Sequence, residues 1–235
     1  MIIIVGYIIL IGIIKFIIPK SHKHYTIISG VLLSLISALR SIYFGPDTIG
    51  YVVKYNSLKY VQLSDLWIDF ITYNSKDPFF YLVSKIINML GGNYRVWLSI
   101  IAVVFCFSVS KVIYRYSKEP YISFITLISL GYLYFSFTGL RQAVALSITL
   151  MSYTYLREHK MLPFVMLILI ASLFHASALI FLIAYPLAYM KIGIKHIVGI
   201  FGALILAIFY ESQIRELISL VAWTENLSNY TYKET

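Results

Sequence analysis

The sequence predicts an all-α protein, a polytopic bundle of transmembrane helices, from its composition, its long apolar runs and the basic residues between them. Of 235 residues, 60% are hydrophobic and 12% are charged, and the mean hydropathy is +0.83. This apolar share exceeds that of an ordinary soluble domain. The formal charge is +9, but the lysines and arginines lie mostly between apolar runs, which is typical of membrane topology rather than of nucleic-acid binding. No repeat or flexible linker divides the chain, so we expect a single membrane domain over residues 1–235.

Seven apolar runs are long enough, or nearly so, to cross about 30 Å of hydrocarbon as helices. The first run has no basic leader and no small-residue cleavage site, so we expect a span and not a signal peptide. By the positive-inside rule, the basic short connections are cytoplasmic, which leaves the N-terminus and segment 45–95 outside. The expected spans are 1–18, 25–44, 96–114, 120–138, 140–156, 162–190 and 194–210.

The run 162–190 is expected to be a broken helix. A single crossing would leave Lys191 and Lys195 on the outer side, whereas two half-helices would return them to the cytoplasm. The small and polar residues around His175 are where such a break is expected. Irregular backbone at membrane depth is tolerated where it is buried in protein or lines a wet cavity. The alternative is one long tilted helix whose His175 faces a neighbour.

The outer segment 45–95 is too long for a simple loop and carries its own helix signals. Asp47 and Asp77 suit helix N-caps, and Pro78 suits the first helical position. Gly91 and the glycine that follows it are expected to end the second of these helices. The polar tail 211–235 follows a span that ends outside, and its apolar spacing predicts a short amphipathic helix.

Polar residues from separate parts of the chain meet at one outer level in this topology. They are Arg40, Asp47, Arg141, Gln142 and His175. Arginine suits phosphate oxygens because its planar fork donates two parallel charge-assisted bonds and keeps its charge. The two arginines therefore suit a diphosphate, whose developing charge they would stabilise as it leaves.

If the diphosphate is the leaving group of a lipid-linked sugar, the hydroxyl that attacks the sugar must give up its proton, and His175, Asp47 or Asp77 could accept it. Each candidate also has a purely structural interpretation. The arginines can extend to lipid headgroups, His175 can bond backbone freed at a helix break, and the aspartates can be caps. The sequence contains no nucleotide-binding glycine motif, no Cys/His metal spacing and no Asp-x-Asp pair. We expect a reaction without metal or cofactor.

Four segments resemble the EpsG family of bacterial exopolysaccharide polymerases, which are similar to Wzy polymerases, and they occur in the family's order. They are Gly45-Pro-Asp-Thr-Ile-Gly-Tyr, Lys76-Asp-Pro-Phe-Phe-Tyr, Gly139-Leu-Arg-Gln-Ala-Val-Ala and Ser172-Leu-Phe-His-Ala-Ser-Ala-Leu. The likeness covers roughly residues 25–190. Members of the family usually continue through further spans, so the resemblance leads us to expect a chain shortened at its C-terminus.

The resemblance implies a multi-pass enzyme of the bacterial cytoplasmic membrane that joins undecaprenyl-diphosphate-linked repeat units into exopolysaccharide or capsule on the outer face. Its partners would be that lipid-linked oligosaccharide, membrane lipids, and flippase and chain-length regulator proteins, with no nucleic acid. We assign Arg141, His175 and Asp77 to catalysis, and Arg40, Asp47 and Gln142 to substrate binding. A flippase or transporter of the same lipid-linked sugars is the main alternative, since broken helices and buried arginines also suit transport.

Overall fold

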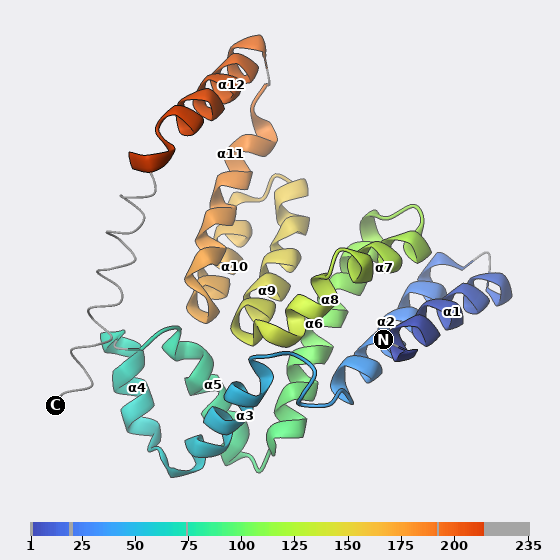
Figure 1. Ribbon diagram of the computed structural model, residues 1–235, viewed down its shortest axis with the longest axis vertical. Coiled ribbons are helices and arrows are strands. Elements are labelled where there is room, and N and C mark those ends of the chain that lie inside the picture. The colour runs from blue at the N-terminus through green and yellow to red at the C-terminus, as the bar shows by residue number, and fades with distance from the viewer. Residues whose placement is uncertain (1, 19–20, 74, 192, 214–235) are drawn as a thin grey trace. The chain divides into compact units, whose positions relative to one another are not determined.

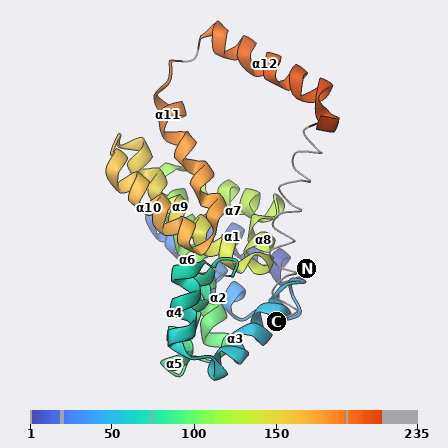
Figure 2. The same cartoon turned by 90° about the vertical axis from the view of Figure 1, so that its left-hand side faces the viewer.

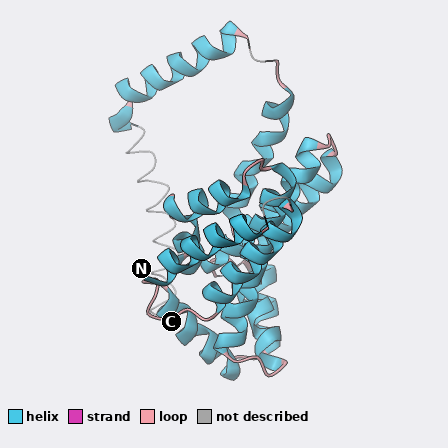
Figure 3. Ribbon diagram, turned by 90° about the vertical axis from the view of Figure 1, so that its right-hand side faces the viewer, coloured by secondary structure: helices cyan, strands magenta, loops and turns pink. Residues whose placement is uncertain are grey.

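The computed structural model describes residues 2–18, 21–73, 75–191 and 193–213, and every regular element within them is helical (Figures 1 and 3). The prediction of an all-α protein is therefore confirmed. The elements are α1 (Ile2–Ile17), α2 (His22–Ala38), α3 (Thr48–Ser57), η1 (Leu58–Tyr60), α4 (Leu63–Thr72), α5 (Pro78–Met89), α6 (Tyr94–Tyr116), α7 (Pro120–Ser129), α8 (Tyr132–Thr138), α9 (Leu140–Arg157), α10 (Met161–Phe174), η2 (Ala176–Ile183), α11 (Ala184–Tyr189) and α12 (Ile194–Phe209).

The chain divides into two compact units, Met1–Ala188 and Tyr189–Thr235. The first unit holds all of the residues assigned above to catalysis or substrate binding. The second contains α12, an apolar helix. The single domain expected over residues 1–235 stays a prediction.

Helix α6 is the centre of the first unit, because α2, α7 and α9 all pack against it. Small residues allow the close approach of α2, since an added Cβ at Gly30 would collide with the Ser110 side chain of α6. On α9, the small residues Ala143 and Ser147 are fully buried, so they serve close helix packing. Helices α3 and α5 pack against the first turns of α6, and α4 packs on α5 (Figures 1 and 2).

By length and composition, one described helix is long and apolar enough to cross a membrane: α6, with 23 residues and a mean hydropathy of 2.3. The pair α7 and α8 passes the same test together, although the two helices are bent by 52° at their junction. Several other apolar helices are shorter, such as α10 with its 14 residues. The polytopic bundle of seven spans stays a prediction.

Two of the expected spans have different limits in the structure. The run 120–138 is not one helix, because Gly131 adopts φ +78 and separates α7 from α8. Glycine takes this left-handed conformation without the Cβ penalty of other residues. The run 25–44 forms helix only as far as Ala38, so Arg40 lies beyond the end of α2. In both cases apolar composition extends past a local backbone break, which hydropathy alone does not detect.

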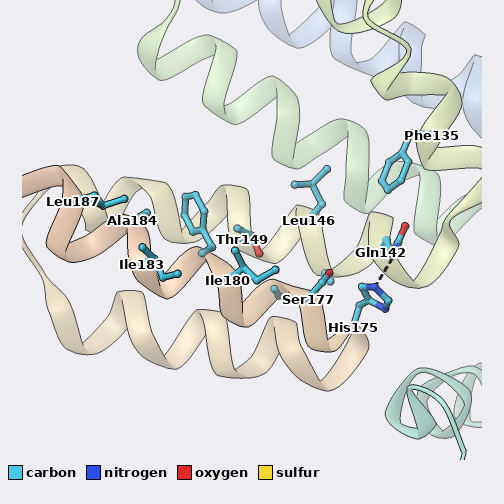
Figure 4. A pocket seen from close by; sticks show the side chains of 13 residues that line it. Phe135, Gln142, Leu146, Thr149, His175, Ser177, Ile180, Ile183, Ala184 and Leu187 are labelled. Atoms are coloured by element: carbon cyan, nitrogen blue, oxygen red, sulfur yellow. Dashed lines mark hydrogen bonds between the residues drawn. The ribbon is translucent and has the colours of Figure 1, made fainter. Parts of the chain in front are cut away.

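The run 162–190 is broken at His175, as expected. His175 has an extended backbone, with φ −162 and ψ 118, between α10 and η2. The two arms pack against each other and meet at His175 (Figure 4). This geometry excludes the alternative of one continuous helix, and it leaves the imidazole at the tip of a helical hairpin.

The segment 45–95 is folded, as expected, and contains α3, η1, α4 and α5. Pro78 occupies the first position of α5, and Gly91 and Gly92 end that helix. Gly91 has φ +83, and the amide N–H of Gly92 donates to the Ile87 carbonyl at 3.0 Å. The amphipathic helix expected in the tail falls on 214–235, outside the described residues.

Candidate functional site

The carboxylate of Asp77 is the meeting point of three segments that are distant in the sequence. Its Oδ2 atom lies 3.1 Å from Nη1 of Arg141 and 2.9 Å from Nδ1 of His175. The Asp77 side chain is only 3% exposed, whereas those of His175 and Arg141 are 13% and 19% exposed. A buried carboxylate thus supports two polar side chains that remain accessible from outside the protein.

The backbone of Asp77 favours this role over helix capping. Asp77 occupies the N-cap position of α5, but its side chain makes no capping hydrogen bond. Its φ of 56 and ψ of 55 are left-handed, whereas an N-cap residue usually lies in the extended region. An L-residue in this conformation costs about 1–2 kcal/mol. The ion pair with Arg141 and the bond to His175 compensate for that cost.

Arg141, in the first turn of α9, is held by three oxygen atoms. Its Nε donates to Tyr51 Oη at 3.2 Å, and its Nη1 donates to the Lys76 carbonyl at 3.0 Å, beside the Asp77 carboxylate. Within the described residues, Nη2 has no hydrogen bond. The guanidinium is therefore fixed by its Nε and Nη1 atoms, and Nη2 can bind an anion.

Gln142 completes the cluster by bonding the far side of the imidazole. Its Nε2 lies 3.0 Å from Nε2 of His175 (Figure 4). An ionised carboxylate only accepts hydrogen bonds, so the Nδ1–H of His175 donates to Asp77, and Nε2 carries the lone pair that accepts from the amide. This tautomer gives His175 a basic nitrogen directed away from Asp77, in the arrangement in which a carboxylate orients a histidine base.

The glycine before α9 makes room for that amide. An added Cβ at Gly139 would lie 2.9 Å from Oε1 of Gln142, closer than such atoms normally approach. The φ of Gly139 is −95, which any residue adopts, so its requirement for glycine is one of space. Gly139 therefore allows Gln142 to reach His175.

Lys54 supplies a second cation beside the cluster. Its Nζ lies 4.0 Å from the centre of the Tyr81 ring, one helical turn along α3 from Tyr51. Burial lowers the pKa of Lys54, and the positive charge of Arg141 lowers it further. The two cations are thus close enough to repel each other, and a multiply charged anion bound between them would offset that repulsion.

Arg40 is buried at a different place. Only 9% of the residue is exposed, its Nη1 donates to the Ser37 carbonyl at 2.7 Å, and its Cζ lies 4.5 Å from the centre of the Phe137 ring. Its Nε and Nη2 are buried and have no hydrogen-bond partner among the described residues. The structure does not bring Arg40 into contact with Asp77, Arg141 or His175.

Asp47 also lies outside the cluster. It occupies the N-cap position of α3, as expected, but its exposed side chain makes no capping hydrogen bond. The segment that contains it reaches the cluster through Tyr51 instead.

In the described part of the chain, no group of three or more His, Cys, Asp or Glu residues is arranged to hold a metal ion.

The structure thus brings together Asp77, Arg141, Gln142 and His175, and adds residues that sequence reasoning missed. Tyr51 was not among the predicted site residues. It ends the motif that begins at Gly45, however, and that position was a usable signal. Lys54 lies outside every motif, and only its packing on Tyr81 reveals it.

One of three comparisons with known proteins finds a match. The model of the EpsG family matches residues 23–234, which include every residue of the cluster. No curated protein and no solved structure matches the chain. Because the family model spans nearly the whole sequence and includes all of the motifs that form the cluster, the chain belongs to the EpsG family.

Proposed function

We propose that this chain is a polymerase of the bacterial cytoplasmic membrane that joins undecaprenyl-diphosphate-linked repeat units into exopolysaccharide or capsule on the outer face. The family, with its context of exopolysaccharide biosynthesis, supplies the substrate class. The observation that carries the proposal is the single buried carboxylate, Asp77, that binds both Arg141 and His175. That arrangement pairs a phosphate-binding cation with a general base, the two functions that glycosyl transfer from a lipid diphosphate needs.

In the proposed reaction, a hydroxyl of the incoming repeat unit attacks the anomeric carbon of the sugar at the lipid end of the growing chain. The new carbon–oxygen bond forms as the bond from that carbon to the diphosphate oxygen breaks, and the diphosphate leaves with the electron pair. His175 accepts the hydroxyl proton on Nε2, and Asp77 stabilises the resulting imidazolium. Because Gln142 covers Nε2 in this structure, its amide must move aside when the hydroxyl binds.

The diphosphate would be held where α9 begins. Peptide N–H groups in the first turn of a helix lack intrahelical partners and favour anions. Arg141 lies in this turn, which contains no acidic residue. A cation at the positive end of a helix dipole is unfavourable unless an anion compensates for it. The Asp77 carboxylate does so beside Nη1, and a bound anion would add to this at Nη2. Lys54 provides the additional charge that the second phosphate requires.

The test is the substitution Arg141→Ala in a strain whose polymer depends on this protein. We expect polymer to be lost while the variant protein is still inserted in the membrane at the wild-type level. Arg95→Ala is the matched control, because Arg95 is exposed in the first turn of α6 and lies over its neighbour Tyr94. Polymer of normal amount and length from Arg141→Ala would contradict the proposal.

A flippase for the same lipid-linked sugars is the second candidate, and the broken backbone at His175 favours it, because discontinuous helices form the binding sites of many transporters. The two functions separate when substrate is supplied on the outer face of sealed vesicles. A polymerase forms polymer from that substrate without transport, whereas a flippase forms none.

A further inference from the structure

We propose that the groove between α9 and the η2–α11 segment binds the hydrocarbon chain of the lipid substrate and delivers the attached diphosphate to Arg141. This inference rests on the proposed function and adds the site of the lipid chain to it. It requires a groove of sufficient size, an apolar lining and continuity with the polar cluster.

The groove has a volume of about 700 Å³, within the range of sites that hold small organic ligands. It runs from Gln142 and His175 at one end to Leu187 at the other (Figure 4). Alanines on both walls, at positions 145 and 184, keep it open. Apolar side chains make up most of its lining, so a hydrocarbon chain is a better match than a sugar.

Continuity with the polar cluster identifies the occupant. Gln142 and His175 line the groove and are also members of the cluster. A molecule with its chain in the groove would therefore carry its polar end past the imidazole to the first turn of α9. Only an amphiphile with an anionic head and a long apolar tail uses both parts, and a polyprenyl diphosphate is such a molecule.

The groove is also open along its length, as a lipid chain requires. Ile180 and Ile183 line it and are 69% and 57% exposed. In a membrane these side chains contact lipid without cost, so a chain can enter sideways from the bilayer. This route lets the substrate bind without leaving the membrane.

The test measures binding to the full chain in phosphatidylcholine nanodiscs, with geranylgeranyl diphosphate and inorganic diphosphate as probes. Ala184→Trp fills the groove away from the polar cluster. Leu179→Trp is the matched control, because Leu179 is exposed on η2 and does not line the groove. We expect Ala184→Trp to weaken geranylgeranyl diphosphate binding by about tenfold or more and to leave inorganic diphosphate binding unchanged, whereas Leu179→Trp changes neither.

Three results would overturn the inference. The wild-type protein could bind both probes equally, or Ala184→Trp could bind geranylgeranyl diphosphate as tightly as the wild type does. In the third, phosphatidylglycerol displaces geranylgeranyl diphosphate as well as the unlabelled diphosphate does. The last would make the groove a site for ordinary lipid. Failure of the proposed function gives a different pattern. Arg141→Ala would then leave inorganic diphosphate binding intact, while Ala184→Trp would still remove the tighter binding that the hydrocarbon chain gives geranylgeranyl diphosphate.

Discussion

Nδ1 of His175 lies 2.9 Å from Oδ2 of Asp77, a contact between residues 98 positions apart in the sequence. It joins the tip of the α10–η2 hairpin to the start of α5, and each residue has an irregular backbone at that point. Asp77 is left-handed where a helix begins, and His175 is extended where a helix is interrupted. One interaction thus joins two residues with irregular backbone, and residues with unusual backbone conformations cluster at active sites and ligand-binding sites.

The first prediction concerns the charge of Asp77. Asp77→Asn keeps the size of the side chain, and asparagine also tolerates the left-handed backbone. The variant loses the ion pair with Arg141 and no longer selects the tautomer with a proton on Nδ1 of His175. We expect polymer synthesis in vesicles to fall by about a hundredfold or more, with expression unchanged. Asp65→Asn, an exposed site on α4, is the control, and full activity of Asp77→Asn would contradict the role of the carboxylate.

The second prediction concerns Gly139. An added methyl group would displace the Gln142 amide from His175, since the Cβ atom at residue 139 would lie 2.9 Å from Oε1 of Gln142. Because Gln142 is assigned to substrate binding, a displaced amide would no longer hold the substrate beside His175. Gly139→Ala should therefore reduce polymer synthesis as much as Gln142→Ala does, by about tenfold, which is the effect of one lost hydrogen bond. The double variant should be no worse than either single variant, because both act through one contact. Independent losses that multiply in the double variant would show that Gly139 acts elsewhere.

Local features of this fold were predictable from the sequence because short-range rules govern them. The start of α5 at Pro78 and its end at Gly91 follow from backbone preferences of a few neighbouring residues. The break at His175 follows from the charges that flank the run 162–190, together with the small and polar residues around His175. The contact of Asp77 with His175 and Arg141 was not predictable in the same way. It depends on how α5, α9 and α10 pack, and side-chain direction at a helix end is set by that packing.

The same limit explains the residues whose contacts differ from expectation. Arg40 was expected at the same outer level as Arg141 because both lie near the outer ends of apolar runs, but α2 ends at Ala38 and the guanidinium lies over the Phe137 ring. Hydropathy locates a residue along the membrane normal and carries no information on the direction in which its side chain points. Lys54 was not predicted because a lysine in a polar segment has no distinguishing pattern.

The third prediction is a pH dependence at Lys54. Burial and the charge of Arg141 lower its pKa, so the ammonium loses its proton at a lower pH than an ordinary lysine does. Binding of inorganic diphosphate that depends on this charge should weaken as pH rises toward the alkaline range, before free lysine titrates at about 10.4.

Lys54→Arg isolates this effect, because guanidinium stays charged throughout the range. The variant should bind inorganic diphosphate at neutral pH and lose the alkaline decline. Lys59→Arg, at an exposed position of η1, should keep the wild-type profile. An unchanged profile in Lys54→Arg would assign the decline to another group.

The fourth prediction separates the structural role of Arg40 from a role in binding. Methionine can keep the packing against Phe137 but loses the bond to the Ser37 carbonyl, a cost of about 1 kcal/mol. It also removes the buried Nε and Nη2 groups, which lack hydrogen-bond partners among the described residues, and each such group costs about 1–3 kcal/mol. The balance favours the variant, so Arg40→Met should match or exceed the wild-type melting temperature in detergent. If Arg40 binds substrate through those two nitrogens, the same variant should bind inorganic diphosphate more weakly despite its stability. A lower melting temperature with unchanged diphosphate binding would instead show that the guanidinium serves the fold alone, through its bond to the Ser37 carbonyl in the last turn of α2.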